Sequence, residues 1–151
     1  MPPWVDNRYP TMYLFVYGTL LSSVPSSMSK FLRRRATLLG AATVNGTLYD
    51  LGMYPGFTTG GGRVRGEVYE LEPVREEETL SMLDAYEGVT GEPQDEYVRE
   101  PIGATLGNGR NVTAITYRSR RLPGDASPIK TGDYARFYAH SKAHQRFVNG
   151  G

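Results

Sequence analysis

The stretch Tyr13-Leu-Phe-Val-Tyr17 places five apolar or aromatic residues side by side, and Gly18-Thr-Leu-Leu21 follows directly. A short continuous apolar run predicts a strand that is buried on both faces, although periodicity alone does not separate it from a short buried helix. The strong β formers in the run and the glycine that ends it favour the strand. This strand should lie at the centre of the fold, and its break at Gly18 needs an explanation.

A glycine that ends a buried strand lets the backbone approach a ligand closely. Successive N–H groups after it can point at one anion or one carbonyl oxygen. The tetrapeptide Tyr17-Gly-Thr-Leu20 can form such a cradle. A plain strand-to-loop turn has the same pattern, so the tetrapeptide by itself leaves both interpretations open.

A second candidate for chemistry is the stretch Leu83-Asp-Ala-Tyr-Glu-Gly88, at the end of an expected helix over residues 76–86. The negative end of the helix macrodipole disfavours a carboxylate at Glu87 and raises its pKa. A carboxylate with a raised pKa suits a general base at pH 7. A solvated glutamate in the last helical turn is the alternative, and this motif alone does not exclude it.

Periodicity and turn residues outline the remaining elements. We expect an extended lead-in over residues 1–11, one domain over residues 12–147 and a frayed tail over residues 148–151. The spacing of apolar residues predicts a short helix after Pro25 and another over residues 133–147. Further strands are expected over residues 38–50, 64–71, 97–106 and 111–119, with turns at Asn45-Gly46, Tyr54-Pro-Gly56, Gly60-Gly-Gly62 and Gly107-Asn-Gly109.

The order of these elements indicates the fold class. Strands outnumber helices and alternate with them irregularly, which predicts an α+β, or mixed α/β, domain. We expect a small, curved, β-barrel-like sheet with a few flanking helices.

Composition excludes several classes of function. The 17 basic and 16 acidic residues give a net charge of +1, so bulk charge attracts neither nucleic acid nor an anionic membrane. The sequence has no cysteine, which excludes disulfides, thiolate metal sites and a thiol nucleophile. No apolar run approaches the roughly 20 residues that cross a bilayer, and the first residues lack a signal-peptide pattern. We therefore expect a cytoplasmic protein without nucleic-acid or membrane partners.

The two candidate stretches belong to a larger pattern that resembles the γ-glutamylcyclotransferase-like family. The similarity is greatest to its branch of γ-glutamylamine cyclotransferase, AIG2-like and YtfP-like proteins. Short motifs follow one another in the family's order between Tyr13 and Tyr138. They are Phe15-Val-Tyr-Gly-Thr-Leu20, Tyr54-Pro-Gly56, Val64-Arg-Gly-Glu-Val-Tyr-Glu70, Leu83-Asp-Ala-Tyr-Glu-Gly88, Tyr97-Val-Arg99, Ala114-Ile-Thr-Tyr117 and Gly132-Asp-Tyr134.

The resemblance implies a fold and a site. The fold would be a compact mixed α/β domain around a small β-barrel, with a cavity beside the Tyr-Gly-Thr-Leu loop. Glu87 would be the catalytic residue. The γ-glutamyl part of the substrate would bind to the loop, and two tyrosines would lie near the cavity. The implied binding residues are therefore Tyr17, Gly18, Thr19, Leu20, Tyr97 and Tyr117.

The implied reaction needs few protein groups. The α-amine of a γ-glutamyl amide attacks its own γ-carbonyl, which closes the ring of 5-oxoproline and releases an amine. A tethered nucleophile of this kind reaches an effective molarity on the order of 10⁵ M or more. Glu87 would be the general acid and base, and N–H groups of residues 18–20 would receive negative charge. We expect a γ-glutamyl(amine) cyclotransferase of transferase or lyase type with no cofactor and no metal.

Some questions remain open at the level of the sequence. The alternative to the enzyme is a non-catalytic binding or regulatory module that keeps the fold and the cavity. The partner is a small γ-glutamyl molecule in either case, and the protein would be a monomer or a weak homodimer. Two loops, residues 21–26 and the acidic residues 90–96, depart from the family or could cover the pocket. We expect them to contact the leaving group.

Three other motifs have weaker functional interpretations. His140 and His144 have the spacing of two metal ligands on a helix, but a solvated helix face explains them more simply. The run Arg33-Arg-Arg35, with Arg118, Arg120 and Arg121, could form a basic patch, but ordinary exposed positions fit the balanced charge. The run Gly60-Gly-Gly-Arg63 lacks the Lys-Ser/Thr of a phosphate-binding loop, so a flexible turn is expected.

Overall fold

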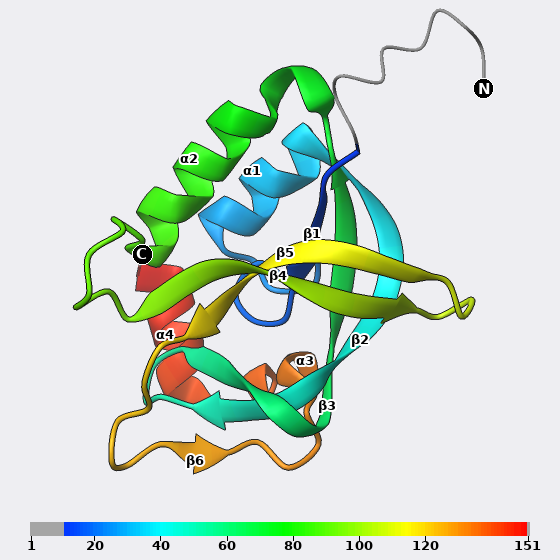
Figure 1. Cartoon of the computed structure of the whole chain (residues 1–151). Coiled ribbons are helices and arrows are strands. Elements are labelled where there is room, and N and C mark those ends of the chain that lie inside the picture. The colour runs from blue at the N-terminus through cyan, green and yellow to red at the C-terminus, as the bar shows by residue number, and fades with distance from the viewer. Residues whose placement is uncertain (1–10, 151) are drawn as a thin grey trace, which may run out of the picture.

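The computed structural model describes residues 11–150 and consists of a β-barrel with helices packed around it (Figure 1). The strand order is β3-β1-β5-β4-β2, and β3 also pairs with β2, so these five strands form a closed barrel. The short strand β6 adds to β2 outside the barrel. The strands are β1 (Tyr13–Val16), β2 (Ala36–Asp50), β3 (Pro55–Leu71), β4 (Tyr97–Leu106), β5 (Asn111–Ser119) and β6 (Ser127–Pro128). The predicted α+β fold with a barrel-like sheet is confirmed.

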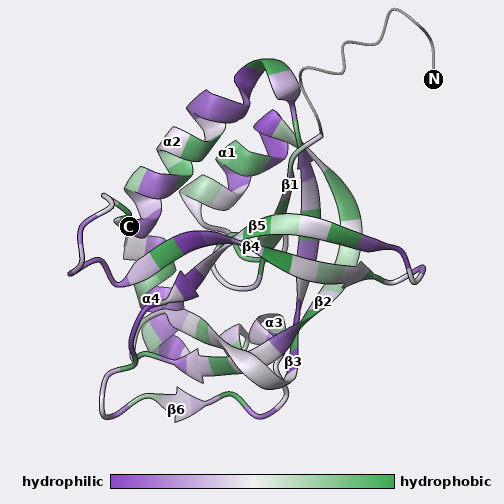
Figure 2. Cartoon of the chain, viewed as in Figure 1, coloured by the Kyte–Doolittle hydropathy of each residue, from purple (hydrophilic) through white to green (hydrophobic). Residues whose placement is uncertain are grey.

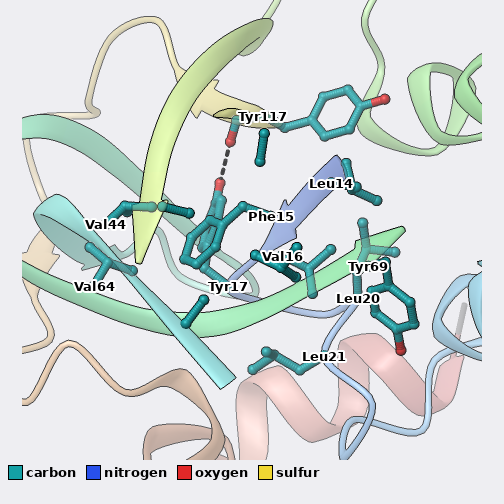
Figure 3. Close-up of a cluster of buried hydrophobic side chains, with 14 of the residues drawn as sticks. Leu14, Phe15, Val16, Tyr17, Leu20, Leu21, Val44, Val64, Tyr69 and Tyr117 are labelled. Atoms are coloured by element: carbon teal, nitrogen blue, oxygen red, sulfur yellow. Dashed lines mark hydrogen bonds between the residues drawn. The ribbon is translucent and has the colours of Figure 1, made fainter. Parts of the chain in front are cut away.

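Strand β1 lies between two partners. It pairs antiparallel with β3 and parallel with β5, and Leu14, Phe15 and Val16 are at most 2% exposed. Burial on both faces is the reason that its sequence does not alternate. Figure 3 shows these side chains inside a cluster that also contains Val44, Val64 and Tyr69. The prediction of a buried strand at this position is confirmed.

Two helices lie side by side against the barrel (Figure 1). They are α1 (Ser27–Arg35) and α2 (Glu76–Glu87), and the 3₁₀ turn η1 (Pro73–Arg75) precedes α2. Helix α2 ends because Gly88 adopts a left-handed conformation with φ 68°, and its N–H and that of Val89 bond back to the last helical carbonyls. Both helices alternate hydrophobic and hydrophilic residues along their length (Figure 2). Both were predicted from their spacing.

The hairpin at residues 107–109 is also confirmed, but two other predicted turns are wrong. Residues Asn45-Gly46 lie inside β2, and Gly60-Gly-Gly62 lies inside β3. Between the pairs Asn45–Arg63 and Thr47–Thr58, β3 has residues 59–62 where β2 has only Gly46. Residues 59–62 therefore form an irregular β-bulge opposite Gly46, which lets two long strands bend around the barrel. The reversal between these strands falls instead at residues 51–54, where the N–H of Leu51 bonds to the carbonyl of Tyr54 over 3.0 Å.

The predicted helix over residues 133–147 is two helices. They are α3 (Tyr134–Tyr138) and α4 (Lys142–Gly150). Helix α4 starts anew because the hydroxyl of Ser141 accepts a hydrogen bond from the N–H of His144 over 3.3 Å. The predicted frayed tail is wrong for residues 148–150, because they complete α4 and Val148 is buried. The predicted lead-in lies outside the described residues except for Thr11, which is exposed and belongs to no helix or strand.

A buried polar chain attaches these C-terminal helices to the barrel. His144 is fully buried, and its Nδ1 lies 2.8 Å from the hydroxyl of Tyr134 in α3. Its Nε2 lies 2.7 Å from a carboxylate oxygen of Asp50 at the end of β2. His140 is exposed in the link between the helices. The prediction that both histidines lie on a solvated helix face is therefore wrong for His144, whose partners are distant in sequence.

Candidate functional site

A cavity with a volume of about 280 Å³ opens where the first strand ends. Its wall contains the end of β1 and the loop after it, the C-terminal end of α2, and single residues of β4, β5 and α4. Every site residue predicted from the sequence lines this cavity: Tyr17, Gly18, Thr19, Leu20, Glu87, Tyr97 and Tyr117. Three parts of the chain that are far apart in sequence thus meet at one place.

Glu87 is the last residue of α2, and its side chain is half-buried in the cavity wall. Burial raises the pKa of this carboxyl group to about 8, and the negative charge of the nearby Glu96 adds to the increase. The direction matches the prediction, but the main cause is the loss of water rather than the helix dipole. At neutral pH the carboxyl group is therefore close to its midpoint of titration and can both accept and donate a proton.

The loop of residues 17–20 is fixed from behind by serines. The hydroxyl of Ser26 donates to the carbonyl of Thr19 over 2.6 Å and also accepts from the N–H of Ser29 at the start of α1. The hydroxyl of Ser29 donates to the carbonyl of Leu21 over 2.8 Å. The segment of residues 21–26, which was expected to contact the leaving group, therefore supports the loop and does not line the cavity.

Three backbone N–H groups of this loop have no acceptor within the described part of the chain. Gly18, Thr19 and Leu20 are buried, yet among residues 11–150 no acceptor bonds to their backbone N–H groups. Buried N–H groups in proteins nearly always have a partner. These three donors therefore favour the interpretation of the loop as a cradle over that of a plain turn.

The reason for glycine at position 18 is steric. A Cβ atom at this position would lie 2.6 Å from Cγ of Pro55, which belongs to the Tyr-Pro-Gly motif. Its φ is not in the left-handed region, so no special conformation is required. The reason expected for this glycine was a close approach between the backbone and a ligand. The structure gives a different reason, which is the close packing of the loop on the start of β3.

Two tyrosine hydroxyl groups at the cavity have their protons committed to the backbone. Tyr17 donates to the carbonyl of Tyr117 over 2.6 Å, as Figure 3 shows. Tyr97 donates to the carbonyl of Pro55 over 2.6 Å. Burial and the negative charges of Glu87 and Glu96 raise the pKa of both phenols well above its ordinary value. Both side chains are thus neutral, and their oxygen atoms can only accept further hydrogen bonds.

Tyr117 is held by a charged pair. Its hydroxyl donates to one oxygen of Asp84 over 2.7 Å, and Arg99 donates to the other oxygen over 2.8 Å. Asp84 lies one helical turn before Glu87 on α2. The network therefore fixes the C-terminal end of α2 against β4 and β5.

The structure adds site residues that the sequence interpretation missed. Tyr86 forms a hydrogen bond of 2.7 Å with the hydroxyl of Thr19. Tyr54 and Phe147 also line the cavity. Tyr54 and Tyr86 belong to two of the family motifs, so the sequence could have identified them as site residues. No local pattern marks Phe147.

The acidic loop of residues 90–96, which was considered as a lid, contributes Glu96 alone to the cavity. The carboxylate of Asp95 accepts hydrogen bonds from the N–H groups of Thr90 and Gly91 and fixes the loop internally. Hydrogen bonds to the charged form lower the pKa of Asp95. Glu96 is held beside the cavity by this fixed loop.

The histidine and arginine motifs of the sequence do not form a recognisable binding site in the described part of the chain. Within residues 11–150, no group of three or more His, Cys, Asp or Glu side chains could hold a metal ion. In that same part of the chain, no helix has the length and apolar character that would let it cross a membrane. Arg33 donates to the carbonyl of Ser22, and Arg35 forms an ion pair of 3.1 Å with Glu78. These contacts suit surface arginines.

Comparison with known proteins agrees with this geometry. The family model described as γ-glutamyl cyclotransferase, AIG2-like, matches residues 14–136. The chain belongs to this family. The γ-glutamylcyclotransferase family proteins YtfP of Citrobacter rodentium and of Escherichia coli K12 are each 37% identical to it over 94 residues. This alignment spans 62% of the chain and 76% and 77% of the two relatives, respectively.

Solved structures extend the similarity to the fold of the γ-glutamyl cyclotransferase family. The solution structure of YtfP from Escherichia coli has a TM-score of 0.53 and 32% identity, and the match covers 82% of this chain and 96% of that one. An AIG2-like protein from Mus musculus has a TM-score of 0.61 and 21% identity, with coverage of 76% and 81%. A structure named γ-glutamyl cyclotransferase has a TM-score of 0.59 and 18% identity, with coverage of 93% and 87%.

Proposed function

We propose that this protein is an enzyme that converts a small γ-glutamyl amide into 5-oxoproline and a free amine. One observation carries the proposal. Glu87, whose pKa is raised to about 8, lines the same cavity as residues 18–20, whose N–H groups have no partner among residues 11–150. The family and the names of the relatives support the same class of reaction.

The reaction does not require a nucleophile from the protein. The α-nitrogen of the substrate forms a bond to the carbonyl carbon of its γ-carboxamide, and the bond from that carbon to the amide nitrogen breaks. The α-ammonium group loses two protons in total, and the departing nitrogen gains two, so the products are 5-oxoproline and an ammonium ion. The enzyme therefore needs only a group that accepts a proton from the α-nitrogen and donates it to the departing nitrogen. Glu87 has this role.

The pKa of Glu87 suits that proton transfer. An α-amino group titrates at about 8 in peptides, and somewhat higher beside a free carboxylate. The carboxyl group of Glu87 titrates at about 8. Transfer of a proton from the substrate to Glu87 is therefore nearly balanced in free energy, whereas an ordinary glutamate would be too weak a base.

The remaining polar groups fit the other parts of the substrate. The N–H groups of Gly18, Thr19 and Leu20 can donate hydrogen bonds to the α-carboxylate or to the γ-carbonyl oxygen, on which negative charge develops. The hydroxyl oxygens of Tyr17 and Tyr97 can accept hydrogen bonds from the α-ammonium group, because their own protons are committed elsewhere. Each charged end of the glutamyl unit thus has partners of matching polarity.

The test is the release of 5-oxoproline from a panel of γ-glutamyl amides, measured by mass spectrometry. The wild type should form it, and Glu87→Gln should reduce kcat by at least about a hundredfold, because general acid–base catalysis contributes factors of that order. Glu92→Gln is the matched control, since Glu92 is exposed and does not line the cavity. A wild type that binds 5-oxoproline but turns over no amide would instead support the non-catalytic binding module.

A further inference from the structure

The mouth of the cavity combines one carboxylate with two aromatic rings. Glu96 and Phe147 are exposed, and Tyr54 is half-buried beside them. The hydroxyl of Tyr54 lies 2.8 Å from each carboxylate oxygen of Glu96 and donates to this group. The rings of Tyr54 and Phe147 lie 5.3 Å apart between centroids. Three separate elements of the fold thus bring these groups together at the open end of the site.

The charges around the cavity have one sign. Among the described residues that line it, Glu87 and Glu96 are carboxylates, and none is lysine, arginine or histidine. The inner groups already have roles in the proposed function, since they bind the two charged ends of the glutamyl unit. Glu96 contributes there only through its charge, which raises the pKa of Glu87, and no part of the substrate has yet been assigned to it.

The chemistry of the mouth favours a cation. A carboxylate has about four acceptor sites, and Tyr54 uses only part of this capacity. Aromatic rings attract a cation that lies close to their faces. A carboxylate in the leaving group would be repelled by the like charge of Glu96, and none of the described residues that line the cavity is basic to offset this repulsion.

We propose that Glu96, together with Tyr54 and Phe147, selects γ-glutamyl amides whose departing amine carries a second, positively charged amino group. This inference rests on the proposed function, because it assigns the leaving-group end of the same cavity. The protein would therefore prefer aminoalkyl amides to γ-glutamyl amino acids, whose leaving groups carry a carboxylate.

The test uses three substrates of matched length. They are the aminobutyl, pentyl and carboxypropyl amides of the γ-carboxyl group of glutamate, whose far ends are cationic, neutral and anionic. For the wild type, kcat/KM should be on the order of fivefold higher for the aminobutyl than for the pentyl amide, as expected for an exposed ion pair with cation–π support. The carboxypropyl amide should be the slowest.

The variant Glu96→Gln should bring the ratio of the aminobutyl to the pentyl amide close to one and should accelerate the carboxypropyl amide relative to both. Glu92→Gln, in the same loop but outside the cavity wall, should keep the wild-type ratio. A wild type that prefers the pentyl or carboxypropyl amide would overturn the inference. So would a Glu96→Gln variant that keeps the wild-type ratios among the three substrates, because Glu96 would then not act on the leaving group.

A binding measurement separates this inference from the proposed function. If no amide yields 5-oxoproline, the proposed function fails, but calorimetry with the same three amides still measures the preference for charge. Tighter binding of the aminobutyl amide to the wild type than to Glu96→Gln would support the cationic site without turnover. Equal binding to both proteins would refute it.

Discussion

The carboxyl group of Glu87 lowers the stability of the folded protein at neutral and alkaline pH. Its pKa is 4.5 in the unfolded reference and about 8 in the folded protein, so the folded state favours the neutral form. The contribution of this group to stability is therefore fully present below pH 4.5 and is lost as the pH rises toward 8. Glutamine is neutral at every pH and avoids this loss.

We therefore expect Glu87→Gln to be more stable than the wild type at pH 8 by about 1–2 kcal/mol, a value reduced for access of water to the cavity. At pH 5 the difference should nearly vanish. Urea denaturation at the two pH values measures it. A gain that is the same at both would show that the raised pKa is not its cause.

The charge of Glu96 provides a second prediction for Glu87. This charge raises the pKa of Glu87, so its removal should lower that pKa. In Glu96→Gln the acid limb of the pH profile of kcat/KM should move to lower pH by about 0.3 units, a small value because exposed charges are screened. The pentyl amide is the substrate for this measurement, since it has no second charge. A limb that moves to higher pH would contradict the assignment of Glu87 as the base.

At the scale of elements, Ser26 connects the loop of residues 17–20 to helix α1. Its hydroxyl caps the helix and holds the carbonyl of Thr19. Ser26→Ala should therefore lower the free energy of unfolding by about 1 kcal/mol, as the loss of a helix N-cap does. It should also raise KM, because the loop that carries the N–H donors loses its support.

Thermal unfolding and steady-state kinetics measure the two effects of Ser26→Ala. Ser23→Ala is the matched control, since Ser23 is exposed in the same loop and its side chain forms no hydrogen bond with the described residues. A loss of stability with an unchanged KM would mean that Ser26 serves the helix alone.

The elements also show what local sequence can predict. The strand at Tyr13–Val16 and the end of α2 at Gly88 follow from patterns within a few residues, and both were predicted. The glycines at 60–62 fit a turn or a bulge equally well, and only the curvature of the closed barrel decides between them. The same limit applies to the site. Glu87 lies in a motif, whereas the position of Phe147 depends on how α4 packs.

At the scale of the whole molecule, the C-terminal helix completes the mouth of the cavity. Phe147 lies on α4, and the buried side chain of His144 connects that helix to α3 and β2 through Tyr134 and Asp50. Asp50 belongs to the barrel, so this polar chain ties the last helix to the strands that form the core.

His144→Ala should lower the free energy of unfolding by about 2–4 kcal/mol, because it leaves a void and removes the partners of Tyr134 and Asp50. The same change should speed amide hydrogen exchange in α4 and reduce the preference for the aminobutyl amide, since Phe147 loses its fixed place. His140→Ala is the matched control, because His140 is exposed between the two helices and should change neither property. If exchange in α4 accelerates while the preference for the cationic amide stays at its wild-type value, Phe147 has no part in binding the leaving group, and Glu96 and Tyr54 alone provide that selectivity.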